Sequence, residues 1–214
     1  MDSKAPKSES LTAGRLLLIR SLEEHLASLK SLMDTKLEEI QQTGELLFQT
    51  LTAGNKVLLC GNGGSAADAQ HIAAELVGRY EQPRRAWPAI ALTTDTSALT
   101  AISNDFGYDE VFARQVQALA RKDDLLIAIS TSGTSPNVIR AVEKAKELGC
   151  KTIALTGGDG GRLASLCDYA LIVPSNRTAR VQEAHITIGH LWCEMVDAKA
   201  EPGGKGEGAK GEGR

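Results

Sequence analysis

Two pairs of side chains in this sequence have the types and spacing for proton or metal chemistry. His71 and Glu75 are four residues apart, so on a helix they share one face about one turn from each other. Gln182 and His190 are eight residues apart, a little over two turns, and lie on roughly the same side of a helix. The four together could bind a divalent metal, for which imidazole and carboxylate favour zinc. The spacing also fits a surface ion pair between His71 and Glu75, and glutamine is a poor metal ligand.

If Glu75 and His190 meet, the chemistry open to them is proton transfer next to a carbonyl group. A carboxylate removes a proton from the carbon beside C=O, while an imidazole or a metal stabilises the enediolate oxygen. Aldose–ketose isomerisation needs both roles. No nucleophile–base pair or Schiff-base lysine stands out as a competitor. His185 lies about 60° around the helix from Gln182, and we expect it to be structural or interfacial.

A loop rich in hydroxyl groups offers a place for a phosphate. The apolar run 125–129 leads into Ser130-Thr131-Ser132-Gly133-Thr134-Ser135 and then Pro136, which is typical of a buried strand, a turn and a helix N-terminus. Free N–H groups, the helix dipole and the hydroxyls make this turn an anion cradle without a lysine or arginine. A second loop, Gly61-Asn62-Gly63-Gly64-Ser65, follows the apolar run 56–60 in the same way.

Each loop alone also fits an ordinary polar connection, but two of them in one chain favour a phosphate site. Neither loop is a Walker motif, because no Gly-Lys-Ser/Thr follows. The spacing of Gly61, Gly63 and Gly64 does not match the G-x-G-x-x-G pattern of dinucleotide-binding proteins.

Strand-like and helical segments alternate along the chain. Apolar runs at 56–60, 89–92, 125–129, 152–155 and 169–173 alternate with helical patterns at 66–80, 98–103, 111–121, 136–148 and 179–199. This order predicts an α/β fold, a doubly wound, mostly parallel, Rossmann-like sheet with right-handed crossovers. Both polar loops should open onto one pocket at the carboxyl edge of the strands.

The N-terminal part carries a leucine seam. Apolar side chains recur at steps of four and three at Leu18, Leu22, Leu26, Leu29, Met33, Leu37 and Ile40. This predicts an amphipathic helix or a helix pair within residues 11–54, ended by Gly54-Asn55. Because crossover helices should already cover the sheet, we expect the seam to pair with another subunit rather than with its own sheet.

Composition limits the remaining possibilities. A chain of 214 residues with 42% hydrophobic content can bury one sizeable core, which we place at residues 55–199. A net charge of -3 argues against a nucleic-acid groove, and no segment has the apolar length of a membrane span or signal peptide. The cysteines lack zinc-knuckle or disulfide spacing, so we expect reduced thiols, a core position for Cys60 and a cytoplasmic location. Polar residues 1–10 and the Gly/Lys/Glu-rich residues 200–214 are expected to be disordered.

Five segments together resemble the sugar isomerase (SIS) domain proteins. They are Cys60-Gly-Asn-Gly-Gly-Ser65, Gln70-His-Ile-Ala-Ala-Glu75, Asn104-Asp-Phe-Gly107, Ser130-Thr-Ser-Gly-Thr-Ser135 and Arg180-Val-Gln-Glu-Ala-His185. Within that superfamily the chain looks most like the phosphoheptose isomerases, which convert sedoheptulose 7-phosphate to D-glycero-D-manno-heptose 7-phosphate. The resemblance extends over residues 15–198.

The resemblance implies a role for each matching residue. One zinc ion per subunit would be held by His71, Glu75, Gln182 and His190, with Glu75 also the base and His190 the acid. The sugar would be bound by Asn62, Gly63, Gly64, Ser65, Glu75, Asn104, Asp105 and Gln182, and its phosphate by Ser130, Thr131, Ser132 and Ser135. The family also implies a homotetramer with active sites between subunits, and a product used for surface polysaccharide such as lipopolysaccharide.

A second group in the superfamily, the DnaA initiator-associating proteins, consists of binding scaffolds. Ser65-Ala66-Ala67, Thr94-Asp95 and residues 175–182 look closer to this group, and Ala66 and Ala179 stand where heptose isomerases carry polar residues. The scaffolds lack a carboxylate and an imidazole at the positions of Glu75 and His190, and this chain has both. The sequence therefore favours the enzyme. A DnaA-binding scaffold is the alternative, and a SIS enzyme for another sugar phosphate is the third hypothesis.

Overall fold

The computed structural model describes residues 7–200, with side chains from residue 12 onward. Its strands are β1 (Val57–Gly61), β2 (Ala89–Ala91), β3 (Leu125–Ile129), β4 (Lys151–Gly157) and β5 (Tyr169–Val173). Its helices are α1 (Lys7–Thr52), α2 (Gly64–Val77), α3 (Thr96–Phe106), the 3-10 turn η1 (Tyr108–Glu110), α4 (Val111–Leu119), α5 (Pro136–Glu147), α6 (Gly161–Leu166) and α7 (Thr178–Lys199).

All strand pairs in the described chain are parallel, and the sheet order is β2-β1-β3-β4-β5. The register of β1 and β3 sets Val57 opposite Leu125 and Gly61 opposite Ile129, so the two polar loops leave the sheet at the same edge. The chain continues from β1 to β2 on one side of the sheet and then crosses to β3 on the other side of β1. Such a switch point is where open α/β sheets bind ligands. The predicted α/β fold is confirmed.

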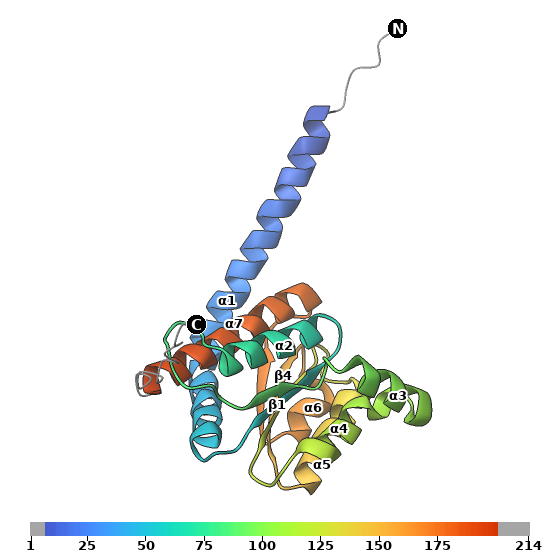
Figure 1. Ribbon diagram of the computed structural model, residues 1–214. Helices are drawn as coiled ribbons and strands as arrows, with labels where there is room; N and C mark the ends of the chain where they lie inside the picture. Colours follow the sequence, from blue (N-terminus) through green and yellow to red (C-terminus); the bar gives the residue numbers. More distant parts are fainter. Residues whose placement is uncertain (1–6, 201–214) are drawn as a thin grey trace, which may run out of the picture.

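Helices cover both faces of the sheet (Figure 1). On one face α1, α2 and α7 pack over a core that includes Leu59, Ile127 and Leu155. On the other face α3 to α6 pack over Leu58, Leu126 and Ala154. Successive strand residues point to opposite faces, so β1 and β3 are buried on both sides and contain no polar side chain.

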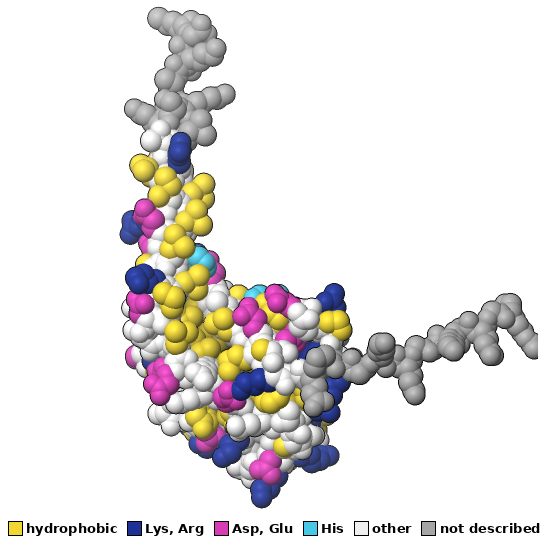
Figure 2. Space-filling model, turned by 90° about the vertical axis from the view of Figure 1, so that its left-hand side faces the viewer, with side chains coloured by type: hydrophobic (Ala, Val, Ile, Leu, Met, Phe, Trp, Pro, Cys, Tyr) yellow, Lys and Arg dark blue, Asp and Glu magenta, His cyan; other side chains and the backbone are white. Residues whose placement is uncertain are grey.

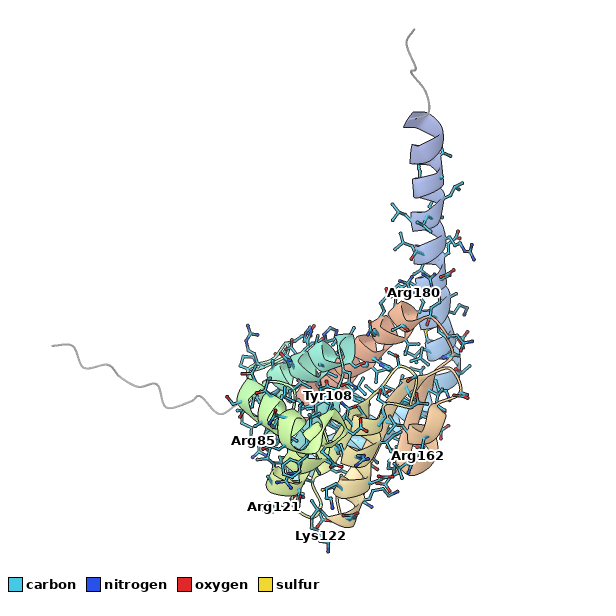
Figure 3. All side chains as sticks on the ribbon, turned by 90° about the vertical axis from the view of Figure 1, so that its right-hand side faces the viewer. Arg85, Tyr108, Arg121, Lys122, Arg162 and Arg180 are labelled. Carbon is cyan, nitrogen blue, oxygen red and sulfur yellow. The ribbon has the colours of Figure 1, made fainter. Side chains whose placement is uncertain are left out.

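Helix α1 is one continuous helix rather than a pair, and its N-terminal half projects from the body (Figure 1). Helix α7 fixes its base, because His25 Nδ1 lies 2.6 Å from Glu183 Oε2 and Arg180 donates to the Ser21 carbonyl (Figure 3). The helix begins at Lys7, so residues 7–10 are helical and the expectation that they are disordered was wrong. Residues 1–6 and 201–214 lie outside the described residues.

The projecting half of α1 displays a row of apolar side chains (Figure 2). Leu18, Leu22 and Met33 are 66%, 64% and 55% exposed, whereas Ile40 at the other end of the seam is 3% exposed. The seam therefore packs on its own domain only at its C-terminal end. None of the helices within residues 7–200 combines the length and apolar character that a bilayer crossing requires.

Candidate active site

His71, Glu75 and His190 come together where α2 packs against α7. His71 Nε2 lies 3.2 Å from Glu75 Oε1 on the same helix and 3.3 Å from His190 Nε2 on α7. The two imidazole rings stand at 69° to each other, with centroids 5.0 Å apart. The His71 side chain is 47% exposed and that of Glu75 is 26% exposed. Three of the four expected zinc ligands thus meet within one chain, at a place that small molecules can reach.

The two helices approach closely because glycine stands at two of their contact points. A Cβ atom added at Gly64 would lie 2.4 Å from Gln182 Nε2, and one added at Gly189 would lie 2.6 Å from the Ile72 side chain. Residue 64 faces 182 and residue 72 faces 189, so the helices run parallel. Side chains along their shared edge are brought within reach of one another.

Two of the contacts at this site, His71 to Glu75 and His71 to His190, can be compared with the spacing of ligands on a metal ion. A ring nitrogen carries either one hydrogen or one in-plane lone pair, so His71 Nε2 cannot form two well-directed hydrogen bonds to Glu75 and His190. Tetrahedral zinc with bonds of about 2.0–2.1 Å sets ligand atoms about 3.3–3.4 Å apart. The observed separations of 3.2 and 3.3 Å are close to this spacing. Within residues 7–200, no group of three His, Cys, Asp or Glu side chains is arranged so that it could hold a metal ion, and the contacts at this site join His71 to Glu75 and His71 to His190.

Gln182, the fourth expected ligand, lies against Gly64 at the start of α2. Eight residues of α7 separate it from His190, which is about 12 Å at 1.5 Å per residue. Within the described chain it makes no hydrogen bond to His71, Glu75 or His190. The structure brings three of the expected ligands together and leaves Gln182 beside the first polar loop.

The hydroxyl loop after β3 has its side chains paired. Ser130 Oγ lies 2.9 Å from Ser135 Oγ, and Ser132 Oγ lies 2.9 Å from Thr134 Oγ1. Gly133 has φ +65°, and a Cβ there would collide with the Gly160 carbonyl oxygen, so this turn requires glycine. Ser135 occupies the N-cap position of α5 as predicted, but its hydroxyl bonds Ser130 instead of capping.

The loop also offers backbone donors for an anion. The N–H groups of Thr131 and Ser132 make no hydrogen bond within the described structure, and the N-terminus of α5 lies directly beyond them. Unpaired N–H groups at a helix N-terminus are a general anion-binding arrangement. These two N–H groups are the donors that an anion at this loop would use, and phosphate binding by the loop stays a prediction.

An amide pair that the sequence did not reveal joins the first polar loop to the start of α5, just beyond the hydroxyl loop. Asn62 Nδ2 donates to Asn137 Oδ1 at 2.9 Å, and Asn137 Nδ2 donates back to Asn62 Oδ1 at 2.8 Å. Tyr108 on η1 also donates to Asn62 Oδ1, at 3.1 Å. The side chain of Asn62, expected to bind substrate, therefore ties the first polar loop to α5 and η1.

The other expected substrate-binding residues lie in different surroundings. Gly63 and Gly64 are exposed at the start of α2, whereas Ser65 is buried. Asn104 and Asp105 lie at the exposed C-terminal end of α3, where Asn104 Nδ2 donates to Asp105 Oδ1 at 2.9 Å. Neither forms a hydrogen bond with the polar loops in the part of the chain that the structure describes.

A pocket of about 410 Å³ opens at the carboxyl edge of the sheet. Its lining comes from the hydroxyl loop, the turn after β4 and the start of α7: Thr131, Ser132, Gly157, Gly158, Asp159, Ser175, Asn176, Thr178 and Val181. We call it the sheet-edge pocket. It lies where the topology predicts a ligand site.

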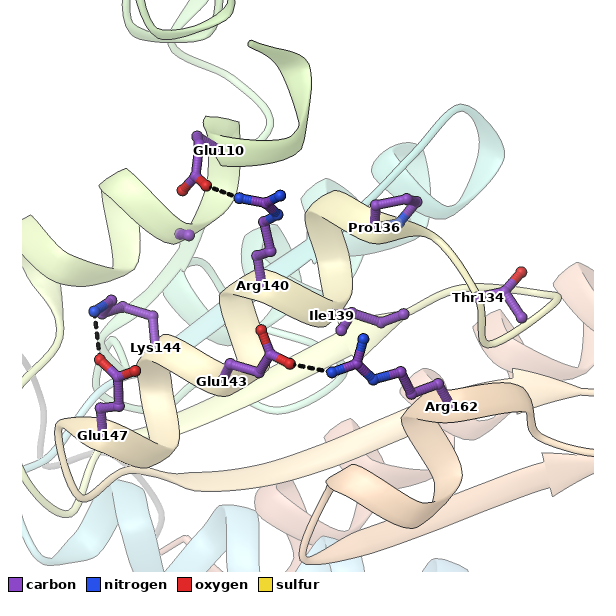
Figure 4. Close-up of a pocket in the computed structure, with 10 residues that line it drawn as sticks. Glu110, Thr134, Pro136, Ile139, Arg140, Glu143, Lys144, Glu147 and Arg162 are labelled. Atoms are coloured by element: carbon purple, nitrogen blue, oxygen red, sulfur yellow. Dashed lines mark hydrogen bonds and ion pairs between the residues drawn. The ribbon is translucent and has the colours of Figure 1, made fainter. Parts of the chain in front are cut away.

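A larger hollow of about 710 Å³ lies on the outer side of α5 (Figure 4). Its cations are already neutralised, because Arg140, Lys144 and Arg162 pair with Glu110, Glu147 and Glu143. Only Thr134 and Pro136 connect it to the hydroxyl loop. The sheet-edge pocket, although smaller, is the one whose lining includes Thr131 and Ser132 of the hydroxyl loop.

Tyr80 is a neighbour of the site that sequence analysis missed. Its ring centroid lies 5.7 Å from that of His190, with the planes at 32°. Burial raises the pKa of its phenol, and the charge of Glu194 raises it further. The sequence analysis placed Tyr80 at the end of a helical pattern at 66–80, whereas α2 ends at Val77 and Tyr80 lies in the turn beyond it.

His185 and Cys60 are structural, as expected. His185 is fully buried with Nε2 3.2 Å from the Thr156 carbonyl oxygen, and burial lowers its pKa to about 4. Cys60 is fully buried at the end of β1, and burial raises the pKa of its thiol. Neither side chain is available for proton transfer at neutral pH.

Comparisons with known proteins agree with this site. The SIS domain family matches residues 22–157. A phosphoheptose isomerase from Aliarcobacter butzleri (strain RM4018) is 58% identical over 180 residues, which covers 84% of this chain and 95% of that protein. The structure of the phosphoheptose isomerase from Neisseria gonorrhoeae is similar, with TM-score 0.82, 47% identity and coverage of 86% of this chain and 98% of that one. That of a phosphoheptose isomerase from Francisella tularensis has TM-score 0.83, 41% identity and coverage of 86% and 99%.

The parallel sheet with two polar loops at its switch point thus defines a SIS-domain protein. Within that class, the chain belongs to the phosphoheptose isomerase family. The resemblance inferred from the sequence is confirmed.

Proposed function

We propose that this protein interconverts sedoheptulose 7-phosphate and D-glycero-D-manno-heptose 7-phosphate by aldose–ketose isomerisation through an enediolate. The observation that carries the proposal is the approach of His190 to the His71–Glu75 pair across two helices and 119 residues of sequence. A carboxylate and an imidazole that both contact one histidine are the groups that proton transfer beside a carbonyl requires. Membership in the phosphoheptose isomerase family supports the same reaction.

Glu75 is the proposed base. Its Oε1 faces His71, while Oε2 makes no hydrogen bond within the described structure and is the atom that takes the proton from the carbon beside the carbonyl. His190 is the proposed acid, because its Nε2 faces His71 and leaves Nδ1 to protonate the enediolate oxygen. Glu75 then returns the proton to the neighbouring carbon while His190 takes a proton back from the other enediol oxygen, which becomes the new carbonyl, and both groups end in their starting protonation states. Each group contributes about 100- to 10,000-fold to the rate.

Zinc is the proposed cofactor, one ion per subunit. His71, Glu75 and His190 would hold it, with Gln182 on the same side of α7 as the expected fourth ligand. When bound, zinc acts as a Lewis acid that polarises the carbonyl oxygen.

The placement of the two parts of the site suits a long sugar phosphate. Helix α7 lines the sheet-edge pocket at Val181 and carries His190 nine residues later, about 13 Å along the helix. In a heptose 7-phosphate, the phosphate and the reacting carbons lie at opposite ends of the carbon chain. We propose that the hydroxyl loop binds the phosphate while the other end reaches Glu75 and His190.

We also propose a homotetramer with sites between subunits, because the exposed leucines of α1 require cover. The proposed location is the cytoplasm, in keeping with the free thiols of all four cysteines. The proposed use of the product is synthesis of nucleotide-activated heptose for surface polysaccharide.

Incubation of the purified protein with sedoheptulose 7-phosphate tests the proposal, with the product sugar identified and zinc measured on the same sample. We expect D-glycero-D-manno-heptose 7-phosphate and about one zinc per subunit. No turnover after zinc reconstitution, together with capture of DnaA, would instead favour the scaffold. Turnover of a different sugar phosphate would point to another SIS enzyme.

A further inference from the structure

A buried ion pair, Arg84 with Asp197, contacts the backbone of Glu75, the proposed base. Arg84 Nε donates to Asp197 Oδ1 at 2.6 Å, and the two side chains are only 1% and 5% exposed. Asp197 Oδ2 accepts hydrogen bonds from the backbone N–H groups of Glu81 and Gln82, at 2.8 and 2.9 Å. Burial raises the pKa of Asp197, but the hydrogen bonds from these amides and from Arg84 outweigh it and hold the pKa below its usual value.

The guanidinium of Arg84 reaches the last turn of α2. Its Nη2 donates to the Glu75 carbonyl oxygen at 2.7 Å, and its Nη1 donates to the Leu76 carbonyl oxygen at 2.9 Å. The last carbonyls of a helix have no partner within the helix, so Arg84 supplies one and also complements the negative end of the helix dipole. The backbone of the proposed base is therefore held directly by this arginine.

Asp197, the acidic member of the ion pair, lies on the same helix as His190. It lies seven residues after His190 on α7, which is close to two full turns, so both residues share one face of the helix. The amides that it binds follow Tyr80, whose ring lies 5.7 Å from the ring of His190. One ion pair thus holds the Glu75 backbone, the Tyr80 turn and the α7 face that carries His190.

We propose that Arg84 and Asp197 are positioning residues that set Glu75 and His190 against each other for proton transfer. The inference rests on the proposed function and deepens it. Neither residue contacts the hydroxyl loop or lines the sheet-edge pocket. Their loss should therefore lower kcat and leave KM nearly unchanged, since phosphate binding is not disturbed. Misplacement of a catalytic group by about 1 Å costs up to about 100-fold in rate.

A second ion pair of the same construction serves as a matched control. Asp124 is 2% exposed, accepts from Lys56 Nζ at 2.5 Å, and also accepts from the backbone N–H groups of Lys56 and Arg121 at 2.9 and 2.7 Å. It lies immediately before β3, at the edge of the sheet opposite the site. Asp124→Asn therefore removes an equivalent charge and leaves the proton-transfer group untouched.

The experiment compares Arg84→Lys, Arg84→Gln, Asp197→Asn and Asp124→Asn in the full-length, zinc-loaded protein. It measures kcat and KM with sedoheptulose 7-phosphate, thermal midpoints, and the Cε1–Hε1 NMR resonance of His190, which senses the ring of Tyr80. We expect kcat to fall about 10- to 100-fold in the Arg84 and Asp197 variants, while KM stays within about twofold of the wild-type value. The decrease in kcat should be smallest in Arg84→Lys. The His190 resonance should shift in the same variants. Asp124→Asn should lower the thermal midpoint without changing kcat or the resonance.

The proposal is overturned if the Arg84 and Asp197 variants lose thermal stability but keep the kcat and the His190 resonance of the Asp124 control. If Arg84→Gln or Asp197→Asn does not fold, Arg84→Lys decides, because it retains the charge opposite Asp197 and loses the forked contact with two carbonyls. If the wild-type protein has no isomerase activity, the proposed function fails. The His190 resonance then still shows whether this ion pair positions the imidazole.

Discussion

The Nε2 atoms of His71 and His190 lie 3.3 Å apart, although their helices are separated by most of the domain sequence. Gly189 precedes His190 on α7 and faces Ile72 on α2. Because Gly189 has no side chain to collide with Ile72, the two helices can approach this closely. The chemistry of the site thus depends on a packing detail one residue away from it.

Gly189→Ala should weaken both stability and activity. Its Cβ would lie 2.6 Å from the Ile72 side chain, so this buried side chain or one of the helices must shift, and such overpacking costs about 1–3 kcal/mol of unfolding free energy. Denaturant unfolding and kcat measure the two effects. Gly14→Ala is the control, because Gly14 is also helical but nothing lies within 4 Å of its Cβ position, and the change should be neutral or stabilising. Equal effects of both substitutions would refute this account of the helix contact.

The exposed leucine seam should control assembly. The double variant Leu18→Glu with Leu22→Glu replaces two leucines that are 66% and 64% exposed with charged side chains. We expect another subunit to cover these positions, so the charges should oppose assembly. Light scattering after size exclusion should show a species smaller than a tetramer, with helix content retained. Thr35→Glu adds charge on another side of α1 and should leave the tetramer intact. If the double variant kept the mass of the wild-type assembly, the leucine seam would not be needed for assembly.

His185 should make stability fall as the solution becomes acidic. Its pKa is lowered from 6.5 to about 4 in the folded state, so below pH 6.5 the unfolded chain takes up a proton that the folded chain refuses. The free energy of unfolding therefore falls by about 3 kcal/mol between pH 6.5 and 4 from this group. In His185→Gln the side-chain amide can still donate to the Thr156 carbonyl oxygen, but residue 185 no longer has an ionisable side chain. Urea unfolding across this range should show a smaller pH slope in the variant, and identical slopes would rule the effect out.

The sequence predicted those features that local patterns encode. The strand at 125–129 matches β3 residue for residue, because an apolar run bounded by polar turns has one simple solution. The helices carrying His71 and His190 were placed correctly, so their spacing on one face could be argued in advance. Helix α6 was missed because six residues are too few to show periodicity and it begins in a glycine run.

Features that depend on tertiary contact could not be predicted in the same way. Arg84 and Asp197 are 113 residues apart, and nothing in the local sequence of either indicates a buried partner. Asn137 follows a proline at a helix start, where its pairing with Asn62 leaves no local signal. Tyr80 reaches His190 only because the turn after α2 folds back onto α7. Such residues complete the site through contacts that only the fold creates.

The central claim is that Glu75 moves a proton between neighbouring carbons of a sugar phosphate. The most direct test is to incubate the zinc-loaded protein with sedoheptulose 7-phosphate in D₂O and follow the product by NMR. The account predicts deuterium at the carbon beside the carbonyl with the wild-type protein, and turnover lowered by at least about 100-fold in Glu75→Gln with the assembly intact. Glu75→Gln working at the wild-type rate would contradict it.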